Sequence, residues 1–200
     1  MGIKERRDRE KLELKNKILN AAEELFAEAG YQNISMRKIA NKIEYSLPTI
    51  YQFFENKADI LFYIFKENNG KLLSAFMEIS KEEYNPLEKL KDMSRAYISF
   101  ALENPHYYEL AYMSNALRYE KNLIYHEPQS PGFKTYELML STITECKEQG
   151  YFQDKEVEVI GQCLWAGIHG LTSLFIGHDE FPWKDKKCLI ENMINSLISK

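Results

Sequence analysis

Five side chains between residues 47 and 52 carry groups that can contact a DNA duplex. The amide of Gln52 can form two hydrogen bonds with N6 and N7 of adenine, and Leu47 and Pro48 can pack against thymine methyl groups. The hydroxyl groups of Thr49 and Tyr51 can reach phosphate oxygens. Because none of these side chains is charged, the segment suits recognition of bases better than general attraction to DNA.

A phosphate-binding position is expected where the next helix begins. The spacing Asn56-x-x-Asp59 resembles a capping box, which places Lys57 at the first helical position. Backbone N–H groups at a helix N-terminus attract anions, and the Lys57 ammonium adds a positive charge. We therefore expect Lys57 and these N–H groups to bind phosphate.

Three short helices are needed to position these side chains. Apolar residues recur at helical spacing over 18–29, and Gly30 can end that helix because glycine adopts φ > 0 without a steric penalty. Ser35 and Ser46 are suitable N-caps for a second and a third helix. Residues 44–46 then form a short turn, the geometry of a helix-turn-helix, which places one helix in the DNA major groove.

The order of these residues resembles the N-terminal domain of the TetR family of transcriptional regulators. The matching residues are Phe26, Gly30, Tyr31, Ser35, Met36, Ile39, Ala40, Ser46, Thr49, Ile50, Tyr51, Phe54, Lys57 and Leu61. The resemblance implies that Thr49, Tyr51 and Lys57 contact phosphates. It also implies backbone or base contacts at the matching positions Ser35, Arg37, Leu47, Pro48 and Gln52.

Two positions depart from the family pattern. Glu44 stands in the turn where members usually have glycine, and a left-handed backbone there would cost about 1 kcal/mol. Pro48 replaces a small glycine or alanine. We expect the motif to survive both changes, although they make its preferred bases unpredictable.

The distribution of charge favours one DNA-facing end. The net charge of the 200 residues is −4. Residues 1–57 hold eleven basic and nine acidic residues, and residues 58–200 hold fifteen and twenty-one. The basic residues are densest at the start of the chain, at Lys4, Arg6, Arg7, Arg9, Lys11, Lys15 and Lys17. This stretch is either an arm ahead of the first helix that contacts phosphates or the minor groove, or a solvated helix face or frayed end.

Composition limits the class of protein further. The sequence contains no run of about 18 apolar residues, so no membrane span is expected. The first 17 residues are highly charged and do not resemble a signal peptide. We therefore expect a cytoplasmic location. Cys146, Cys163 and Cys188 lack C-x-x-C spacing. We expect buried or semi-buried thiols in a reducing compartment, with redox sensing as the alternative.

Every strong pattern after Leu61 is helical, which predicts an all-α fold of about nine helices. Residues 1–57 are expected to form the DNA-binding domain, and residues 58–200 a helical ligand-binding and dimerisation domain. Pro follows Asn or Ser at 85–86, 104–105 and 130–131, which marks three helix starts. The last two helices are expected over about 154–177 and 183–199, and 114–129 is expected to be irregular.

The last two predicted helices are apolar on more than one side. One side can cover the protomer core while another packs against a second copy, which predicts a homodimer through a four-helix bundle. The expected interface residues are Leu164, Ile168, Leu171, Phe175, Met193, Ile194 and Leu197. A dimer would place two recognition helices about 34–36 Å apart on palindromic double-stranded DNA.

Trp165 and His169 share one helix face because they lie four residues apart. With Gly170 they resemble the Trp-x-x-x-His-Gly signature of one C-terminal class of the TetR family. We expect His169 to be a hydrogen-bonded core residue beside glycines that permit close packing. Contact with a ligand is the alternative.

Aromatic side chains are abundant in the middle of the chain. Most should belong to the core, but tyrosines also suit a cavity with an apolar wall and few polar points, and TetR-like regulators bind an inducer between these helices. The candidate pocket residues are Tyr97, Tyr108, Tyr112, Met139, Trp165 and His169. The lining favours an unknown effector that is flat, apolar or aromatic, and no cationic cluster points to an anionic one.

The leading hypothesis is a dimeric repressor that a small-molecule effector releases from DNA by changing the spacing of its recognition helices. His106, His126, His169 and His178 lack metal-ligand spacing and no catalytic motif is present, so no metal, cofactor or enzymatic activity is expected. Two alternatives remain open. One is a helical dimeric interaction protein whose helix-turn-helix no longer reads DNA, and the other is an enzyme that uses the aromatic cavity.

Overall fold

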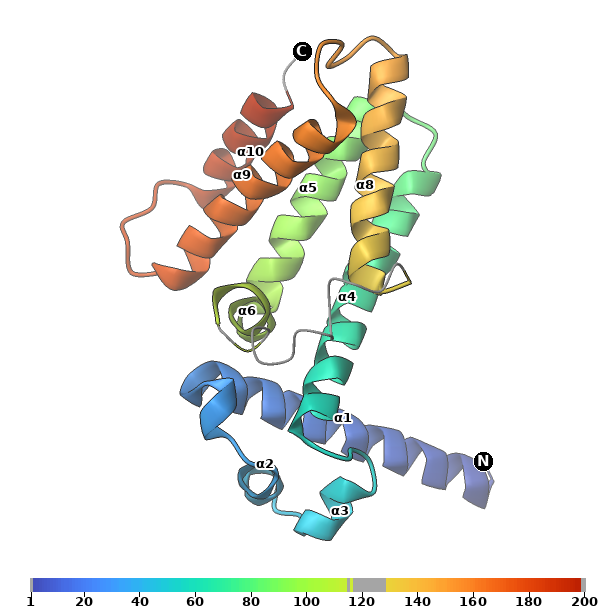
Figure 1. Ribbon diagram of the computed structural model, residues 1–200, viewed down its shortest axis with the longest axis vertical. Coiled ribbons are helices and arrows are strands. Elements are labelled where there is room, and N and C mark those ends of the chain that lie inside the picture. Colours follow the sequence, from blue (N-terminus) through green and yellow to red (C-terminus); the bar gives the residue numbers. More distant parts are fainter. Residues whose placement is uncertain (1, 115, 117–128, 199–200) are drawn as a thin grey trace. The chain divides into compact units, whose positions relative to one another are not determined.

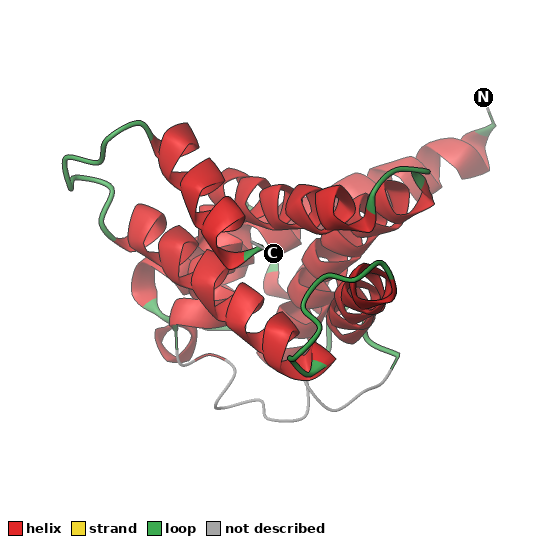
Figure 2. Ribbon diagram, turned by 90° about the horizontal axis from the view of Figure 1, so that it is seen from above, coloured by secondary structure: helices red, strands yellow, loops and turns green. Residues whose placement is uncertain are grey.

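The computed structural model describes residues 2–114, 116 and 129–198, and all regular secondary structure in these ranges is helical (Figures 1 and 2). The α-helices are α1 (Ile3–Ala29), α2 (Met36–Lys42), α3 (Leu47–Tyr51), α4 (Lys57–Lys81), α5 (Pro86–Glu103), α6 (Pro105–Tyr108), α8 (Pro131–Glu148), α9 (Val157–Gly177) and α10 (Lys186–Leu197). A 3₁₀-helix, η1 (Tyr31–Asn33), and a π-helix, η2 (Glu109–Met113), complete the described elements. The predicted all-α class is confirmed. Most of the segment 114–129, with His126, lies outside the described residues.

The starts of three helices confirm the proline-marked boundaries. Asn85 accepts a hydrogen bond from the Leu87 N–H (2.8 Å) ahead of α5, and Ser130 Oγ accepts one from the Phe133 N–H (3.3 Å) ahead of α8. Helix α6 begins at Pro105. In each case the proline lies in the first turn, where its missing N–H has no intrahelical partner to lose.

Helix α1 begins much earlier than its apolar pattern indicates. Residues 3–17 belong to the helix rather than preceding it, so the prediction of an arm ahead of the first helix is wrong and the alternative of a helix face is correct. Two ion pairs with i,i+4 spacing, Arg6–Glu10 (3.3 Å) and Arg9–Glu13 (3.5 Å), support this part of the helix.

The chain divides into two compact units. The first comprises residues 1–67 and 106–126, and the second comprises residues 68–105 and 127–200, so α4 contributes to both. The core of the first unit includes the buried side chains of Ile18, Phe26, Ile39, Ile50 and Ile60 in α1 to α4, and that of Phe54 between α3 and α4. The core of the second is formed by Leu90, Met93, Ile98, Ile143, Leu164, Ile168, Phe175 and Ile194.

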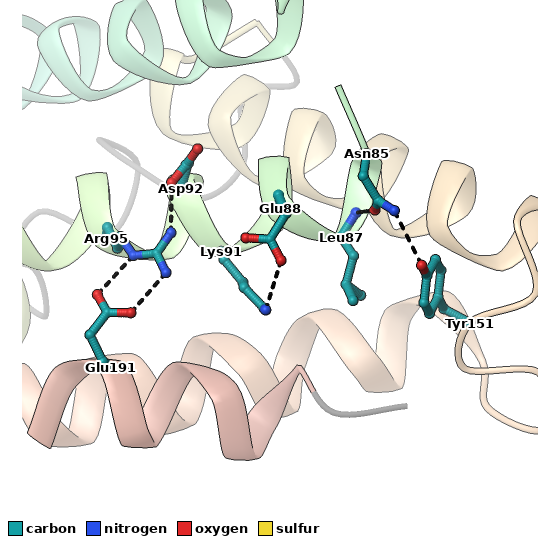
Figure 3. A network of polar contacts seen from close by, with 8 residues as sticks. All are labelled: Asn85, Leu87, Glu88, Lys91, Asp92, Arg95, Tyr151 and Glu191. Carbon is teal, nitrogen blue, oxygen red and sulfur yellow. Dashed lines mark hydrogen bonds and ion pairs between the residues drawn. The ribbon is translucent and has the colours of Figure 1, made fainter. Parts of the chain in front are cut away.

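Helix α5 packs against α8, α9 and α10 in the second unit. A bidentate ion pair fastens α5 to α10: Arg95 Nε and Nη2 each donate to a Glu191 carboxylate oxygen at 2.8 Å (Figure 3). Arg95 Nη1 donates to Asp92 at 2.7 Å. The hydrogen bonds from Arg95 to Glu191 hold the pKa of the Glu191 carboxyl below its ordinary value. At the other end of α5, Asn85 donates to the Tyr151 hydroxyl at 3.2 Å.

Helix α9 is long and apolar enough, by length and composition, to cross a membrane, a test that core helices of water-soluble proteins also pass. Here α9 is partly buried. A Cβ built on Gly167 would lie 2.5 Å from Leu197 Cδ1, so this glycine permits close packing on α10. A Cβ on Gly170 would meet open space. The expectation that glycines allow close packing therefore holds at Gly167 and not at Gly170.

Candidate DNA-binding site

The helix-turn-helix is built by two serine caps. Ser35 Oγ accepts a hydrogen bond from the Lys38 N–H at 3.3 Å and so begins α2. Ser46 Oγ accepts one from the Thr49 N–H at 3.3 Å and so begins α3. The Ser46 and Thr49 hydroxyls also lie 2.7 Å apart in a hydrogen bond. Both predicted caps are confirmed, and each typically contributes about 1 kcal/mol.

Buried aliphatic side chains hold α2 against α1 and α3 against α2. Ile39 and Ile50 are fully buried, and Ala40 is 1% exposed. The small Ala40 leaves room for the chain to reverse, and its carbonyl accepts the Tyr45 N–H at 3.0 Å. Burying one isoleucine contributes about 1.5–3 kcal/mol, so these contacts outweigh the two caps.

The turn between α2 and α3 uses a left-handed residue. Glu44 has φ 61°, a left-handed conformation that glycine adopts without a steric penalty. The backbone strain that we expected if Glu44 had a positive φ is therefore present. Lys17, on α1, supports the turn: its Nζ donates to the Ile43 carbonyl at 3.2 Å and lies 5.2 Å from the centroid of the Tyr45 ring. Sequence reasoning missed this contact because 26 residues separate Lys17 from Ile43.

The exposed surface of α3 carries the side chains expected to contact DNA. Pro48, Tyr51 and Gln52 are exposed, Tyr51 by 52% of its surface, whereas Leu47 and Thr49 are half-buried. On α2, Ser35 and Arg37 are exposed as well. Fully buried Ile50 fixes the rotation of α3, so these side chains project on the side away from the core. Their DNA contacts stay predictions.

Lys57 is held by the protein itself. Its Nζ donates to the Tyr31 carbonyl at 2.8 Å and lies 4.2 Å from the centroid of the Tyr31 ring. The side chain therefore ties the start of α4 to η1, a link that the sequence did not reveal. The predicted cap is present, since Asn56 Oδ1 accepts the Asp59 N–H at 3.0 Å. Asp59 accepts the Glu55 N–H at 3.1 Å rather than that of Asn56.

The candidate pocket residues fall into both units. In the second unit the Trp165 Nε1–H donates to the Tyr97 hydroxyl at 3.3 Å, and that hydroxyl lies 3.1 Å from His169 Nδ1. If Tyr97 accepts from Trp165 and donates to His169, Nδ1 is unprotonated and the histidine is neutral. Burial lowers the pKa of His169, which agrees with the neutral form. The hydrogen bond of His169 is confirmed, but its side chain is half-buried rather than part of the buried core.

The other three candidate pocket residues lie on helices other than α5 and α9, which carry the Trp165–Tyr97–His169 triad. Met139 is a buried residue of α8. Tyr108 and Tyr112 belong to the first unit, with ring centroids 5.0 Å apart. Their joint role as a ligand pocket stays a prediction.

Most residues predicted at the dimer interface are buried within one chain. Leu164, Ile168, Leu171, Phe175 and Ile194 are each at most 8% exposed, whereas Met193 and Leu197 are half-buried. The exposed side of α9 carries other apolar or small residues, namely Val159, Cys163, Ala166, Gly170 and Leu174.

The cysteines only partly follow expectation. Cys146 is buried, but Cys163 and Cys188 are exposed in the single chain, so the prediction that all three thiols are at least semi-buried is wrong for these two. No local pattern marks Cys163 as exposed, because α9 is apolar on more than one side. Within the described residues no group of three His, Cys, Asp or Glu side chains could hold a metal ion.

Two family models match the chain. The model of the bacterial regulatory proteins of the tetR family covers residues 18–64, and that of the tetracyclin repressor-like C-terminal domain covers residues 90–197, more than half of the chain. The chain therefore belongs to the TetR family of transcriptional regulators. The helix-turn-helix described above falls within the first match.

Individual relatives agree with this class. The fatty acid metabolism regulator protein of Bacillus subtilis is 29% identical over 165 residues, 82% of this chain and 84% of that protein. An HTH-type transcriptional regulator of Staphylococcus aureus is 28% identical over 119 residues, which span only 63% of that regulator.

Solved structures share the fold. The fatty acid degradation regulator of Bacillus halodurans has a TM-score of 0.77 at 21% identity, covering 92% of this chain and 94% of the other. A transcriptional regulator of Bacillus subtilis in complex with stearoyl-CoA has a TM-score of 0.76 at 24% identity, covering 92% and 97%.

Proposed function

We propose that this regulator is a cytoplasmic repressor that binds a palindromic DNA operator through α3 as a homodimer and is released by a small-molecule effector. One observation carries the proposal: α3 presents the uncharged side chains Pro48, Tyr51 and Gln52 to solvent, while Ile50 and the Ser46 cap fix its orientation. Residues 1–57 would form the DNA-binding domain, and residues 58–200 the effector-binding and dimerisation domain. No catalytic role is proposed, since the relatives are transcriptional regulators.

DNA selection tests the first part of this function. The purified protein is incubated with a random pool of duplexes at moderate salt, and bound molecules are sequenced over several rounds. We expect one inverted repeat to be enriched by the wild type and not by Gln52→Ala. Exposed Gln153, far from the motif in the chain, supplies the control Gln153→Ala. Absence of enrichment by the wild type would favour the interaction-protein alternative.

We propose a long-chain acyl-CoA as the effector. Support comes from the relatives, since one of them is a fatty acid metabolism regulator and a structure with the same fold contains stearoyl-CoA. The second unit offers an apolar core in which the Trp165–Tyr97–His169 triad supplies polar groups. This proposal keeps the apolar effector that the sequence favoured but drops the flat or aromatic shape, because the aromatic side chains alone do not distinguish a ring from an acyl chain. It also departs from the sequence-based expectation in its anionic CoA group, since no cationic cluster in the sequence points to an anionic effector.

Release of DNA tests the effector. Stearoyl-CoA, stearic acid and free CoA are each added to a complex of the protein with its selected site, and fluorescence anisotropy reports the bound fraction. Release by stearoyl-CoA alone supports the proposal. Release by none of the three, at concentrations that saturate the Bacillus subtilis relative, would exclude an acyl-CoA effector while leaving the DNA-binding function intact.

The dimer is proposed to use the exposed side of α9 defined by Val159, Cys163, Ala166, Gly170 and Leu174. Because a Cβ at Gly170 meets open space, Gly170→Glu leaves the protomer fold intact and places a charge on this side. Gly70, in α4, also has open space around its Cβ and supplies the matched control Gly70→Glu. Sedimentation should show monomers for Gly170→Glu and dimers for Gly70→Glu. A monomeric wild type would contradict the proposal.

A further inference from the structure

Four basic residues form a strip along the N-terminal part of α1. Lys4, Arg7, Lys11 and Lys15 follow helical spacing and fall within about 80° of the helix circumference, at about 100° per residue. The opposite side carries Arg6 and Arg9, each paired with a glutamate one turn later. Among the described residues no ion pair engages Lys4, Arg7 or Lys11. The positive charge of this helix is therefore concentrated on one side.

The strip continues the side of α1 that faces the rest of the first unit. Ile18 and Ala22, on the same side farther along, are fully buried. Lys15 Nζ lies 3.9 Å from the centroid of the Tyr63 ring, and Lys11 Nζ lies 6.0 Å from that of Phe53, the residue after Gln52. The strip therefore begins beside the end of α3 and runs outward from it.

Residues 4–13 are all exposed, so this part of α1 has no buried side, even where Lys11 approaches the Phe53 ring. Figure 1 shows the N-terminal end of α1 extending past α3. At about 1.5 Å per residue the exposed part is about 15 Å long. A helix of this length with no buried face is only marginally stable in water, so a surface that binds it would stabilise it.

We propose that the three outer residues of this strip, Lys4, Arg7 and Lys11, bind phosphates of the operator duplex outside the segment read by α3; these three residues are called the α1 strip below. Lys15 is left out because it pairs with Glu67 at 3.7 Å. The proposal rests on the proposed DNA-binding function and extends its site. The strip lies beside the DNA-reading helix and has the opposite charge to the phosphate backbone. A helix about 10–12 Å wide cannot enter a minor groove about 6 Å wide, so the contacts are to phosphates and not to minor-groove base edges.

The salt dependence of binding tests the α1 strip. Anisotropy titrations at several salt concentrations compare the wild type with Lys4→Gln/Arg7→Gln and with the control Arg6→Gln/Arg9→Gln, which removes the same charge from the other side of the same exposed helix. The slope of log K against log salt should become shallower by about 0.9 for each phosphate that is no longer bound. We expect this change in the strip variant and little change in the control.

Trimming the duplex supplies a second readout. About 15 Å of helix spans about four base pairs at 3.4 Å per pair. Removing about four pairs from each flank should weaken wild-type binding and leave the strip variant almost unaffected. Equal slopes of log K against log salt for the strip and control variants would overturn the proposal that the α1 strip binds phosphates. Equal loss of affinity on trimming for the wild type and the strip variant would overturn it as well. Either result leaves operator binding by the wild type intact. Failure of the wild type itself to bind an operator would overturn both proposals.

Discussion

The helix-turn-helix and the α9–α10 pair differ in what determines which side of each helix is exposed. In α3, of five residues, one fully buried isoleucine fixes which side chains face solvent. In α9, of 21 residues, apolar or small side chains lie on the buried and on the exposed side alike. The exposed side of a helix can be predicted from the sequence where that side is polar. The exposed side of an apolar helix depends on how its neighbours pack and cannot be predicted in this way.

A matched pair of core substitutions tests this contrast most strongly. Ile50→Ala in α3 and Ile168→Ala in α9 each remove a side chain that is at most 2% exposed, and each should lower the free energy of unfolding by about 2–5 kcal/mol. Urea denaturation measures this decrease. Operator affinity below the transition should fall steeply for Ile50→Ala, because α3 loses its orientation. Equal operator affinities for the two variants would show that the two helices do not differ in this respect.

Two serine caps, one in each unit, allow effects on stability to be distinguished from effects on DNA binding. Ser46→Ala and Ser130→Ala each remove a cap at a helix start and should each cost about 1 kcal/mol. Thermal unfolding should detect both decreases in stability. Only Ser46→Ala should also weaken operator binding, since Ser46 holds the first turn of α3. A larger effect of Ser130→Ala on DNA affinity would show that the second unit sets the orientation of α3.

Relief of backbone strain in the turn should have a smaller effect of the opposite sign. Glu44→Gly places the residue without a Cβ at φ 61° and should raise the free energy of unfolding by up to about 1 kcal/mol. Glu44→Ala keeps the strain and serves as the control. The melting temperature reports both. A lower melting temperature for Glu44→Gly than for Glu44→Ala would show that the Glu44 turn is not strained.

The ion pair between α5 and α10 should contribute least, at most about 1 kcal/mol, because both side chains are about one-third exposed. Arg95 lowers the pKa of the Glu191 carboxyl, so this stabilisation is present above the ordinary glutamate pKa and is lost as the pH falls through the lowered value. Glu191→Gln should therefore reduce stability at neutral pH and flatten its decline in acid. Parallel pH profiles of wild type and variant would contradict this.

Local signals allowed much of the fold to be predicted. The starts of α2, α3, α5 and α8 follow from one capping residue each, and the cap acts within three residues of itself. The early start of α1 was missed because charged i,i+4 pairs, rather than an apolar side, support it.

Long-range contacts account for the rest of the candidate site. Lys57 binds the Tyr31 carbonyl and Lys17 binds the Ile43 carbonyl, in each case 26 residues away. The phosphate contact of Lys57 stays a prediction, because its bond to the Tyr31 carbonyl does not test it. The Trp165–Tyr97 contact bridges 68 residues. The sequence grouped both residues as candidates for one pocket but did not predict the hydrogen bond between them.

Whether α3 reads bases can be measured directly at Gln52. Anisotropy gives the affinity of wild type and Gln52→Ala for the selected operator and for operators changed at each adenine in turn. We expect one adenine whose replacement costs the wild type about 1–3 kcal/mol and costs Gln52→Ala almost nothing. If Gln52→Ala binds every duplex as the wild type does, with the same ranking of sites, α3 does not read bases through Gln52 and the proposed mode of DNA recognition is wrong.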